Sequence, residues 1–351
     1  MFEEFLNDRQ ARIDKLQLFA VAGLMLLGVA FVYSATTAGD LESSGPIYRE
    51  EWFRQIVWYA LGLGGAAVVC LIDYHTLARW SYVAYAIAIV LLVLVLVAGN
   101  YHMGAKRWFD LRFFSLQPSE FAKVAFILAL ANFLSRPPDE MRQPLNFWKA
   151  IGLMLLPFVL IMKEPDLGSA LVLLPTGLAM LFVAGVPKRF LLRLVGYVGI
   201  VAALFLIDVL FAPPRWKIKL EGYQRDRILV YFGVDFARAT DSPAERRTAR
   251  ERQDTRSHQV RQALISVGSG GWMGKGWRQG QQTALEFLPR GAAHNDFIFS
   301  VIAEEEGFVG SLLVLTLYAV ILFTGIRIAG QARDRLGKMM EIGRASCRER
   351  V

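Results

Sequence analysis

The sequence contains little cysteine, histidine or charge, and each shortage excludes a class of protein. Cys70 lies inside an apolar run and Cys347 in a polar tail, so the chain has no disulfide framework. The four histidines show no metal-ligand spacing with cysteine or with one another, which argues against a zinc site. Charged residues form 20% of the 351 residues, fewer than the quarter or so that is typical of a soluble domain.

Apolar residues are abundant instead, and they occur in groups. They make up 54% of the chain and gather into runs close to the 17–25 residues or so that cross a bilayer as a helix. The sequence therefore predicts one domain, an all-α polytopic membrane protein with about eight transmembrane helices. The expected spans are Leu16–Thr36, Trp52–Ile72, Trp80–Ala98, Gln117–Ser135, Phe147–Met162, Leu167–Val186, Phe190–Ala212 and Phe308–Ala329.

Basic residues determine the expected orientation. The charged amino-terminal segment lacks the cleavage site of a signal peptide, and lysine and arginine are concentrated in the short loops on its side of the membrane. By the positive-inside rule that side is cytoplasmic, which makes residues 213–295 a large extracytoplasmic loop. The net charge of +8 then reflects cytoplasmic loops and anionic lipid headgroups, so no nucleic-acid partner is expected.

The large loop is not uniform along its length. Gly222–Ala239 alternates basic and aromatic residues, a pattern typical of an amphipathic helix at a membrane interface. Thr240–Ser257 is highly charged and is expected to be mobile, whereas Gln259–Val267 is again helix-like.

Ionisable residues cluster around the start of the fourth expected span. Lys106 and Arg107 stand beside Trp108, which fits an aromatic belt with basic anchors as well as it fits a binding site. Glu120 and Lys123 are three residues apart, so they share one helix face and can pair. Ionisable residues inside a span usually face the bundle interior or a water-filled cavity.

Two further segments carry polar chemistry. The turn KEPDLG holds Lys163, Glu164 and Asp166; chemistry alone favours a solvated loop over a polar rim around an outer cavity. The glycine-rich run GSGGWMGKGWRQG is not a phosphate-binding loop, because Gly276 follows Lys275 where serine or threonine is required. Its glycines would still let the backbone approach a ligand closely.

Asp296 lies where the large loop meets the eighth span. As a helix cap it would accept hydrogen bonds from backbone N–H groups. As a carboxylate at the membrane surface it could instead act as a general base toward a sugar hydroxyl. The residues alone leave both interpretations open.

Five motifs together resemble a known family. GAKRW, QPSEFAK, KEPDLGSA, SGGWMGKGWRQG and FLPRGAAHNDFIFSVIAEEEG are similar to those of the SEDS family (shape, elongation, division, sporulation), in its RodA-like rather than its FtsW-like branch. The resemblance implies one transmembrane domain over residues 1–340 of a peptidoglycan glycosyltransferase. This enzyme would polymerise lipid II into glycan strands during cell elongation and cell-shape maintenance. A lipid II flippase and a non-catalytic scaffold of the elongation machinery are the alternatives.

The resemblance also implies particular residues and partners. The catalytic residue would be Asp296, acting alone or with a divalent cation, Mg or Mn, and with no organic cofactor. The substrate-binding residues would be Lys106, Arg107, Trp108, Glu120, Lys123 and Asp166. Expected partners are lipid II, a class B penicillin-binding protein and membrane proteins of the elongation complex, all at the bacterial plasma (inner) membrane.

Two features depart from the family pattern. The approach to the aspartate reads RGAAHND, where the family has a sequence similar to Glu-x-His-Thr-Asp. The family has roughly ten spans, compared with the eight expected here. Residues 341–351 are therefore expected to be a truncated or non-native tail.

Overall fold

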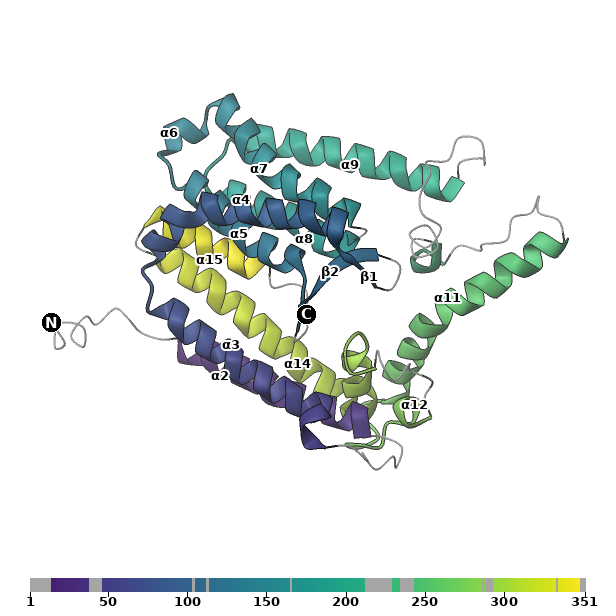
Figure 1. The fold of residues 1–351 in the computed structure, drawn as a ribbon. Helices are drawn as coiled ribbons and strands as arrows, with labels where there is room; N and C mark the ends of the chain where they lie inside the picture. The colour runs from purple at the N-terminus through teal and green to yellow at the C-terminus, as the bar shows by residue number, and fades with distance from the viewer. Residues whose placement is uncertain are drawn as a thin grey trace, which may run out of the picture. The chain divides into compact units, whose positions relative to one another are not determined.

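The computed structural model describes residues 14–37, 46–102, 105–111, 114–164, 166–211, 229–233, 243–285, 287, 293–332 and 334–347. These residues are mostly helical (Figure 1). The chain divides into two compact units. The first consists of Met1–Gln17, Gly65–Gly196 and Val320–Val351, and the second of Leu18–Gly64 and Tyr197–Ala319.

All eight expected spans are helices. They are α2 (Lys15–Thr37), α3 (Glu51–Cys70), α4 (Tyr74–Ala98), α5 (Pro118–Leu134), α7 (Pro144–Lys163), α8 (Leu167–Val183), α9 (Lys188–Phe211) and α14 (Ile298–Gln331). Among the described residues, six of these helices are long and apolar enough to cross a membrane, whereas α5 and α8 have 17 residues each. The prediction of an all-α polytopic membrane protein is confirmed.

Local sequence explains where the helices begin. Pro118 and Pro144 stand in the first turns of α5 and α7, where the missing N–H of proline costs no hydrogen bond. Helix α4 begins at Tyr74, six residues before the expected Trp80, because Asp73 caps it by accepting a hydrogen bond from the His75 N–H at 3.1 Å. Short elements connect the spans: η1 (Ile47–Arg49), α6 (Pro138–Met141) and α12 (Gln281–Ala284). A further helix, α15 (Arg335–Cys347), follows α14.

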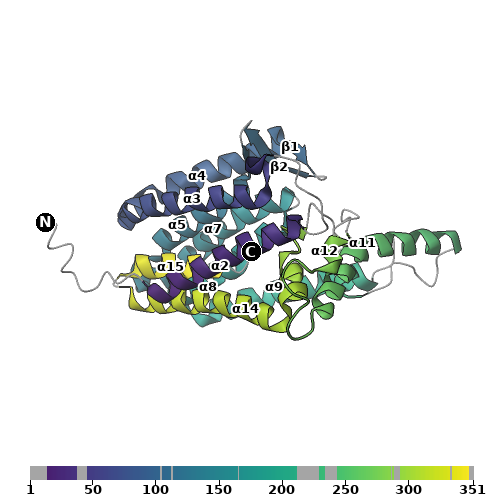
Figure 2. The same ribbon diagram turned by 90° about the horizontal axis from the view of Figure 1, so that it is seen from below.

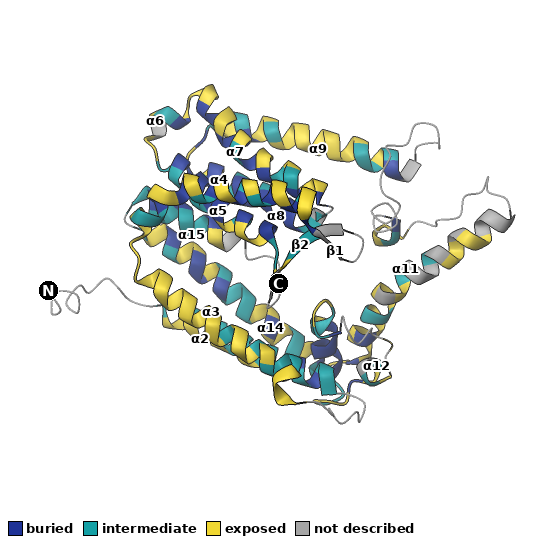
Figure 3. Cartoon of the chain, in the orientation of Figure 1, coloured by how far each residue is buried: buried dark blue, intermediate teal, exposed yellow. Residues whose placement is uncertain are grey.

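Helix α5 is the centre of the first unit. Eleven of its 17 residues are buried, and it lies beside α4 and α7 in both views (Figures 1 and 2). Phe126 and Leu130 are fully buried, and the Asn132 side chain donates hydrogen bonds to the Ala78 carbonyl and the Ser81 hydroxyl at 2.9 and 3.0 Å. By contrast, α3 has no buried residue between Glu51 and Cys70 (Figure 3), which suits a helix that faces lipid.

Helix α15 also belongs to this core. It packs against α5 and α8, Met339 is buried, and Gly343 lies against the side chains of Ile127 and Met180. Residues 341–347 therefore continue a packed helix. The expectation that residues 341–351 are a truncated or non-native tail stays a prediction.

The connection between α4 and α5 is a small antiparallel sheet that the sequence did not predict. Its strands are β1 (Asn100–His102), β2 (Ala105–Leu111) and β3 (Phe114–Leu116), in the order β1-β2-β3. Asn100 pairs with Trp108 and Tyr101 with Lys106, so Arg107 is the extra residue of a β-bulge. Strands β1 and β3 have three residues each, too few to show an alternating pattern. The seven residues of β2 (AKRWFDL) do not alternate strictly between apolar and polar, so the sequence did not predict this strand either.

In the second unit, the charged stretch of the large loop is helical. Helix α11 (Pro243–Ser269) includes most of Thr240–Ser257 as well as Gln259–Val267. The mobility expected for the first of these segments stays a prediction. The segment is rich in alanine, arginine, glutamate and glutamine, which are strong helix formers despite their charge. Of the predicted amphipathic helix at Gly222–Ala239, only 229–233 lie within the described residues, and 229–231 are helical.

The glycine-rich loop of this unit packs against a break in α14. Gly307 has φ +66° and interrupts the helix. Backbone hydrogen bonds join the loop to both sides of the break: Lys275 N to Glu304 O (3.0 Å), Gly276 N to Glu305 O (2.8 Å), Phe308 N to Gly271 O (2.9 Å) and Val309 N to Trp272 O (3.2 Å). A Cβ atom on Gly270 would lie 1.9 Å from the Ala303 carbonyl oxygen. The glycines therefore allow the loop backbone to approach α14.

This contact predicts a difference between two neighbouring glycines. Gly270→Ala should lower the free energy of unfolding by about 1–3 kcal/mol, because its methyl group overlaps the backbone of α14. Gly268→Ala is the matched control, since a Cβ atom there meets no other atom within 4 Å. The test is the Tm of both variants in detergent; equal values would contradict the close approach.

Candidate functional site

The KEPDLG turn is held in place by hydrogen bonds to Asp166. This residue caps α8: one carboxylate oxygen accepts from the Ser169 N–H at 3.1 Å. The other oxygen accepts from the Gln117 side chain, also at 3.1 Å. Asp166 is half-buried, and these contacts give the predicted binding residue a structural role at the junction between α7 and α8.

Glu164, in the same turn, was not predicted as a site residue. Its side chain is only 1% exposed, and neither carboxylate oxygen has a hydrogen-bond partner among the described residues. The interpretation of KEPDLG as a solvated loop is therefore wrong at Glu164. The sequence held one signal, a glutamate directly after the 20 apolar-rich residues of α7, but burial depends on the packing of neighbouring elements.

The surroundings of Glu164 favour its neutral form. Burial raises the pKa of this carboxyl group to about 8; the nearby charge of Asp166 acts in the same direction, and the cation of Arg107 opposes it. The group lies beyond the end of the α7 span. A carboxyl group with a pKa near neutrality can hold or release a proton under physiological conditions.

Strand β2 brings the basic and aromatic candidates to this turn. Arg107, at the bulge, is half-buried, and its Nε donates a hydrogen bond to the Glu164 backbone carbonyl at 3.0 Å. Trp108 is half-buried beside it. The backbone of Lys106 pairs with Tyr101, whereas its side chain lies outside the described residues. The structure therefore joins Arg107 to Asp166 through the turn that contains Glu164.

Glu120 and Lys123 form the pair that their spacing predicts. Lys123 Nζ lies 2.8 Å from Glu120 Oε1, with the lysine side chain 16% exposed and the glutamate side chain 55% exposed. The prediction of pairing on one face of the fourth span is confirmed. The glutamate half of this pair is exposed to solvent, which weakens its contribution to stability.

Asp296 is exposed in the turn that precedes α14. The first turn of the helix is closed by hydrogen bonds from the N–H groups of Ser300 and Val301 to the Phe297 carbonyl. Within the described part of the chain, no hydrogen bond or ion pair reaches the Asp296 carboxylate. The cap interpretation is therefore not what the structure shows, and the carboxylate is available to a ligand.

The acidic run that follows Asp296 is structural where it is buried. The Glu304 carboxylate is fully buried and accepts hydrogen bonds from Lys275 Nζ (2.6 Å), the N–H groups of Gln281 (2.9 Å) and Gln282 (3.1 Å), and the Ser266 hydroxyl (3.1 Å). Glu305 accepts a hydrogen bond from the Ser34 hydroxyl at 2.6 Å. These contacts attach the glycine-rich loop and α2 to α14.

The predicted site residues belong to both units. Asp296 is in the second unit, and the residues from Lys106 to Asp166 are in the first. Within the first unit the structure joins Arg107 and Asp166 near Glu164, and among the described residues Glu120 forms its ion pair with Lys123. The expectation that Asp296 lies at the membrane surface stays a prediction.

Glu164→Gln should reduce the pH dependence of stability. A folded-state pKa near 8 lies above that of an unfolded glutamate, so its contribution is full below the unfolded value and is lost as the pH rises toward 8. For one proton, the free energy of unfolding then falls by up to about 1.4 kcal/mol per pH unit. The wild type should lose Tm between pH 5 and pH 8 in detergent, and the variant should lose less.

The exposed Glu120→Gln is the control for this comparison, because it removes a carboxylate without removing a buried one. A Glu164→Gln protein with the same Tm profile as the wild type would show that Glu164 does not titrate in this range.

Known proteins resemble the chain over most of its length. A family model for cell cycle proteins, FTSW_RODA_SPOVE, matches residues 15–347. The peptidoglycan glycosyltransferase MrdB of Escherichia coli (strain K12) is 34% identical over 332 residues, covering 94% of this chain and 80% of MrdB. The peptidoglycan glycosyltransferase RodA of Treponema pallidum (strain Nichols) is 30% identical over 382 residues, covering 94% of this chain and 85% of that relative.

Solved structures agree with these relatives. A chain from the structure titled "Structural coordination of polymerization and crosslinking by a peptidoglycan synthase complex" has a TM-score of 0.68 and 27% identity, with 96% of this chain and 84% of that chain covered. The rod shape determining protein RodA of Thermus thermophilus has a TM-score of 0.61 and 26% identity, with 97% and 82% covered. The chain therefore belongs to the FtsW/RodA/SpoVE family of cell cycle proteins, the family that its sequence motifs indicated.

Proposed function

We propose that this chain is a peptidoglycan glycosyltransferase that polymerises lipid II into glycan strands during cell elongation and the maintenance of cell shape. Relatives named as peptidoglycan glycosyltransferases support the activity. The observation that carries the proposal is the exposed carboxylate of Asp296, in the turn leading into an apolar span. No other described residue forms a hydrogen bond or ion pair with it.

The chemistry is the transfer of a glycosyl group between two lipid-linked disaccharides. The 4-hydroxyl group of one substrate attacks the anomeric carbon of the other, and a C–O bond forms as the bond to undecaprenyl pyrophosphate breaks. The attacking hydroxyl group must lose its proton, and Asp296 accepts it as general base. A carboxylate without a protein partner suits this task because no competing hydrogen bond has to break first.

Residues of the first unit would hold the substrates. Arg107, and Lys106 beside it in the sequence, would stabilise the negative charge that develops on the leaving pyrophosphate. Trp108 would lie at the membrane interface. The pair formed by Glu120 and Lys123 would contact the polar part of the substrate. Asp166 would act indirectly, because it fixes the turn that positions Arg107.

A divalent cation remains a sequence-based expectation. Within the ranges that the structure describes, no three side chains of histidine, cysteine, aspartate or glutamate converge as metal ligands. The mechanism above therefore passes no step through Mg²⁺ or Mn²⁺, and it requires no organic cofactor.

Partners and topology follow from the same proposal. The solved complex that resembles this chain is described as a peptidoglycan synthase complex that coordinates polymerisation and crosslinking, which supports a class B penicillin-binding protein as the partner here. Lipid II would be the substrate, and other membrane proteins of the elongation complex would join the assembly. The protein would span the bacterial plasma (inner) membrane with its amino terminus in the cytoplasm and residues 213–295 outside.

Replacing Asp296 tests the proposed catalytic base. Asp296→Ala and Asp296→Asn should reduce the rate of polymerisation of purified lipid II in proteoliposomes by about 10²–10⁴-fold, the usual contribution of general base catalysis. Asn295→Ala is the matched control, because Asn295 is exposed in the same turn. Wild-type rates in the Asp296 variants would refute the assignment.

The same assay separates the alternatives. A wild-type chain that moves lipid II across the bilayer without polymerising it would be a flippase. A chain that does neither, yet binds a class B penicillin-binding protein equally well with and without Asp296, would be a scaffold.

Cysteine labelling tests the proposed orientation. In a chain with Cys70→Ser and Cys347→Ser, Arg250→Cys should react with a membrane-impermeant maleimide in intact cells, because Arg250 is exposed on α11 in the proposed outer loop. Lys149→Cys, in the expected cytoplasmic part of α7, should react only after permeabilisation. The reverse pattern would invert the topology.

A further inference from the structure

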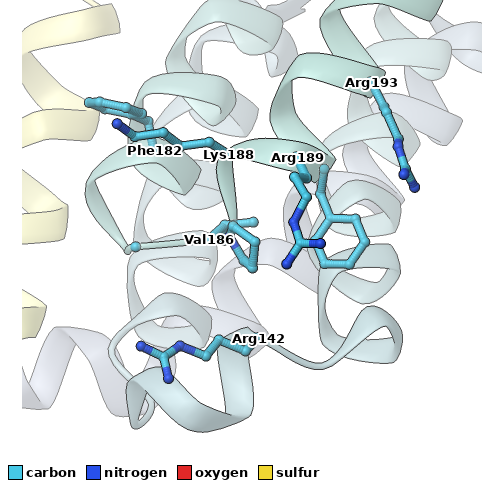
Figure 4. Close-up of a pocket in the computed structure, with 9 residues that line it drawn as sticks. Arg142, Phe182, Val186, Lys188, Arg189 and Arg193 are labelled. Atoms are coloured by element: carbon cyan, nitrogen blue, oxygen red, sulfur yellow. The ribbon is translucent and has the colours of Figure 1, made fainter.

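A cavity of about 710 Å³ opens in the first unit where α8 is followed by α9. The turn Gly185–Pro187 and the first residues of α9 form one side, and Arg142, before α7, contributes from another element. Figure 4 shows Val186 between Arg142 and Lys188, with Arg189 beside it. No part of the proposed catalytic machinery lies in this cavity.

The lining of the cavity is strongly cationic. Arg142, Lys188, Arg189 and Arg193 all line it, and none of its lining residues is acidic. Arg189 and Arg193 are four residues apart, so they share a face of α9. Among the described residues, Arg142 forms an ion pair with Asp139 at 3.4 Å, between side chains that are 69% and 89% exposed. An exposed pair at this distance neutralises little of the positive charge.

The amino-terminal end of α9 adds to the positive potential. Helix α9 begins at Lys188, so the N–H groups of its first turn lie at the cavity and carry partial positive charge. The carboxyl end of α8 would oppose this potential, but the Arg335 guanidinium donates a hydrogen bond to the Ala184 carbonyl there at 2.9 Å.

Position in the membrane and apolar lining decide which anion fits. The α8 helix ends at Val183 and the α9 span begins at Lys188, so the cavity lies where spans end and lipid headgroups begin. Phe182, Phe190 and Val186 line it beside the cations, and the Phe182 side chain is 59% exposed. A soluble anion would make no favourable contact with this apolar surface. A lipid phosphate is joined to a glycerol backbone and acyl chains, which can pack against it.

We propose that this cavity binds the headgroup of an anionic phospholipid, with the phosphate among Arg142, Lys188 and Arg189 and the start of the acyl chains against Phe182. Basic pockets between transmembrane helices on the cytoplasmic side bind anionic headgroups in this way, and positive-inside orientation would put these residues on that side. The inference does not depend on the proposed glycosyltransferase activity.

The test compares two double variants of equal charge. Arg142→Gln/Arg189→Gln removes two cations from the cavity, and Arg79→Gln/Lys149→Gln removes two exposed cations from the same expected membrane face but outside this cavity. Binding of phosphatidylglycerol to the detergent-solubilised full chain is measured by native mass spectrometry. The cavity variant should bind on the order of tenfold to thirtyfold more weakly than the wild type, and the control should bind as the wild type does.

Two further probes identify the ligand. Phosphatidylcholine should bind the wild type more weakly and should not distinguish the variants, and inorganic phosphate should not compete with phosphatidylglycerol at equal concentration. Equal loss in both double variants would mean attraction to the whole charged face and would overturn the proposal. Competition by inorganic phosphate would also overturn it, since the cavity would then recognise a soluble anion.

Discussion

The second unit depends on one buried carboxylate. The Glu304 carboxylate is buried and accepts hydrogen bonds from an ammonium group, a hydroxyl group and two backbone N–H groups. These donors come from α11, the glycine-rich loop and α12, so a single side chain of α14 fixes three segments that precede it. Removing a partner from a buried charge is far more costly than losing a surface ion pair. Asp296 stands eight residues before Glu304, on the same side of the helix break at Gly307.

The features that could be predicted from the sequence are those that depend on residues close together in the chain. Long apolar runs identify spans because crossing a bilayer requires a fixed helix length, and all eight segments are helices. The start of a helix, such as that of α4 at Tyr74, depends on a single capping contact. Hydropathy averaged over a window of residues does not detect such a contact. The pairing of Glu120 with Lys123 could be predicted because it is local to one turn of helix.

The remaining features depend on residues far apart in the chain. Glu164 and Glu304 each lie in a polar or acidic motif, where the sequence alone suggests contact with solvent. Both side chains are nevertheless buried. Asp296, by contrast, is exposed. No local pattern separates these three carboxylates, because burial is decided by which helices and loops cover them. The contact of the glycine-rich loop with α14 could not be predicted for the same reason, because the backbone that its glycines approach lies about 30 residues later in the chain.

The break at Gly307 has a consequence for how this membrane protein is made. Within a bilayer, a helix that loses its internal hydrogen bonds leaves polar backbone groups that cannot be satisfied by lipid. Here the N–H groups of Phe308 and Val309 are satisfied by Gly271 and Trp272, which lie earlier in the chain and therefore leave the ribosome first. The segment that satisfies these groups is therefore already synthesised when α14 emerges.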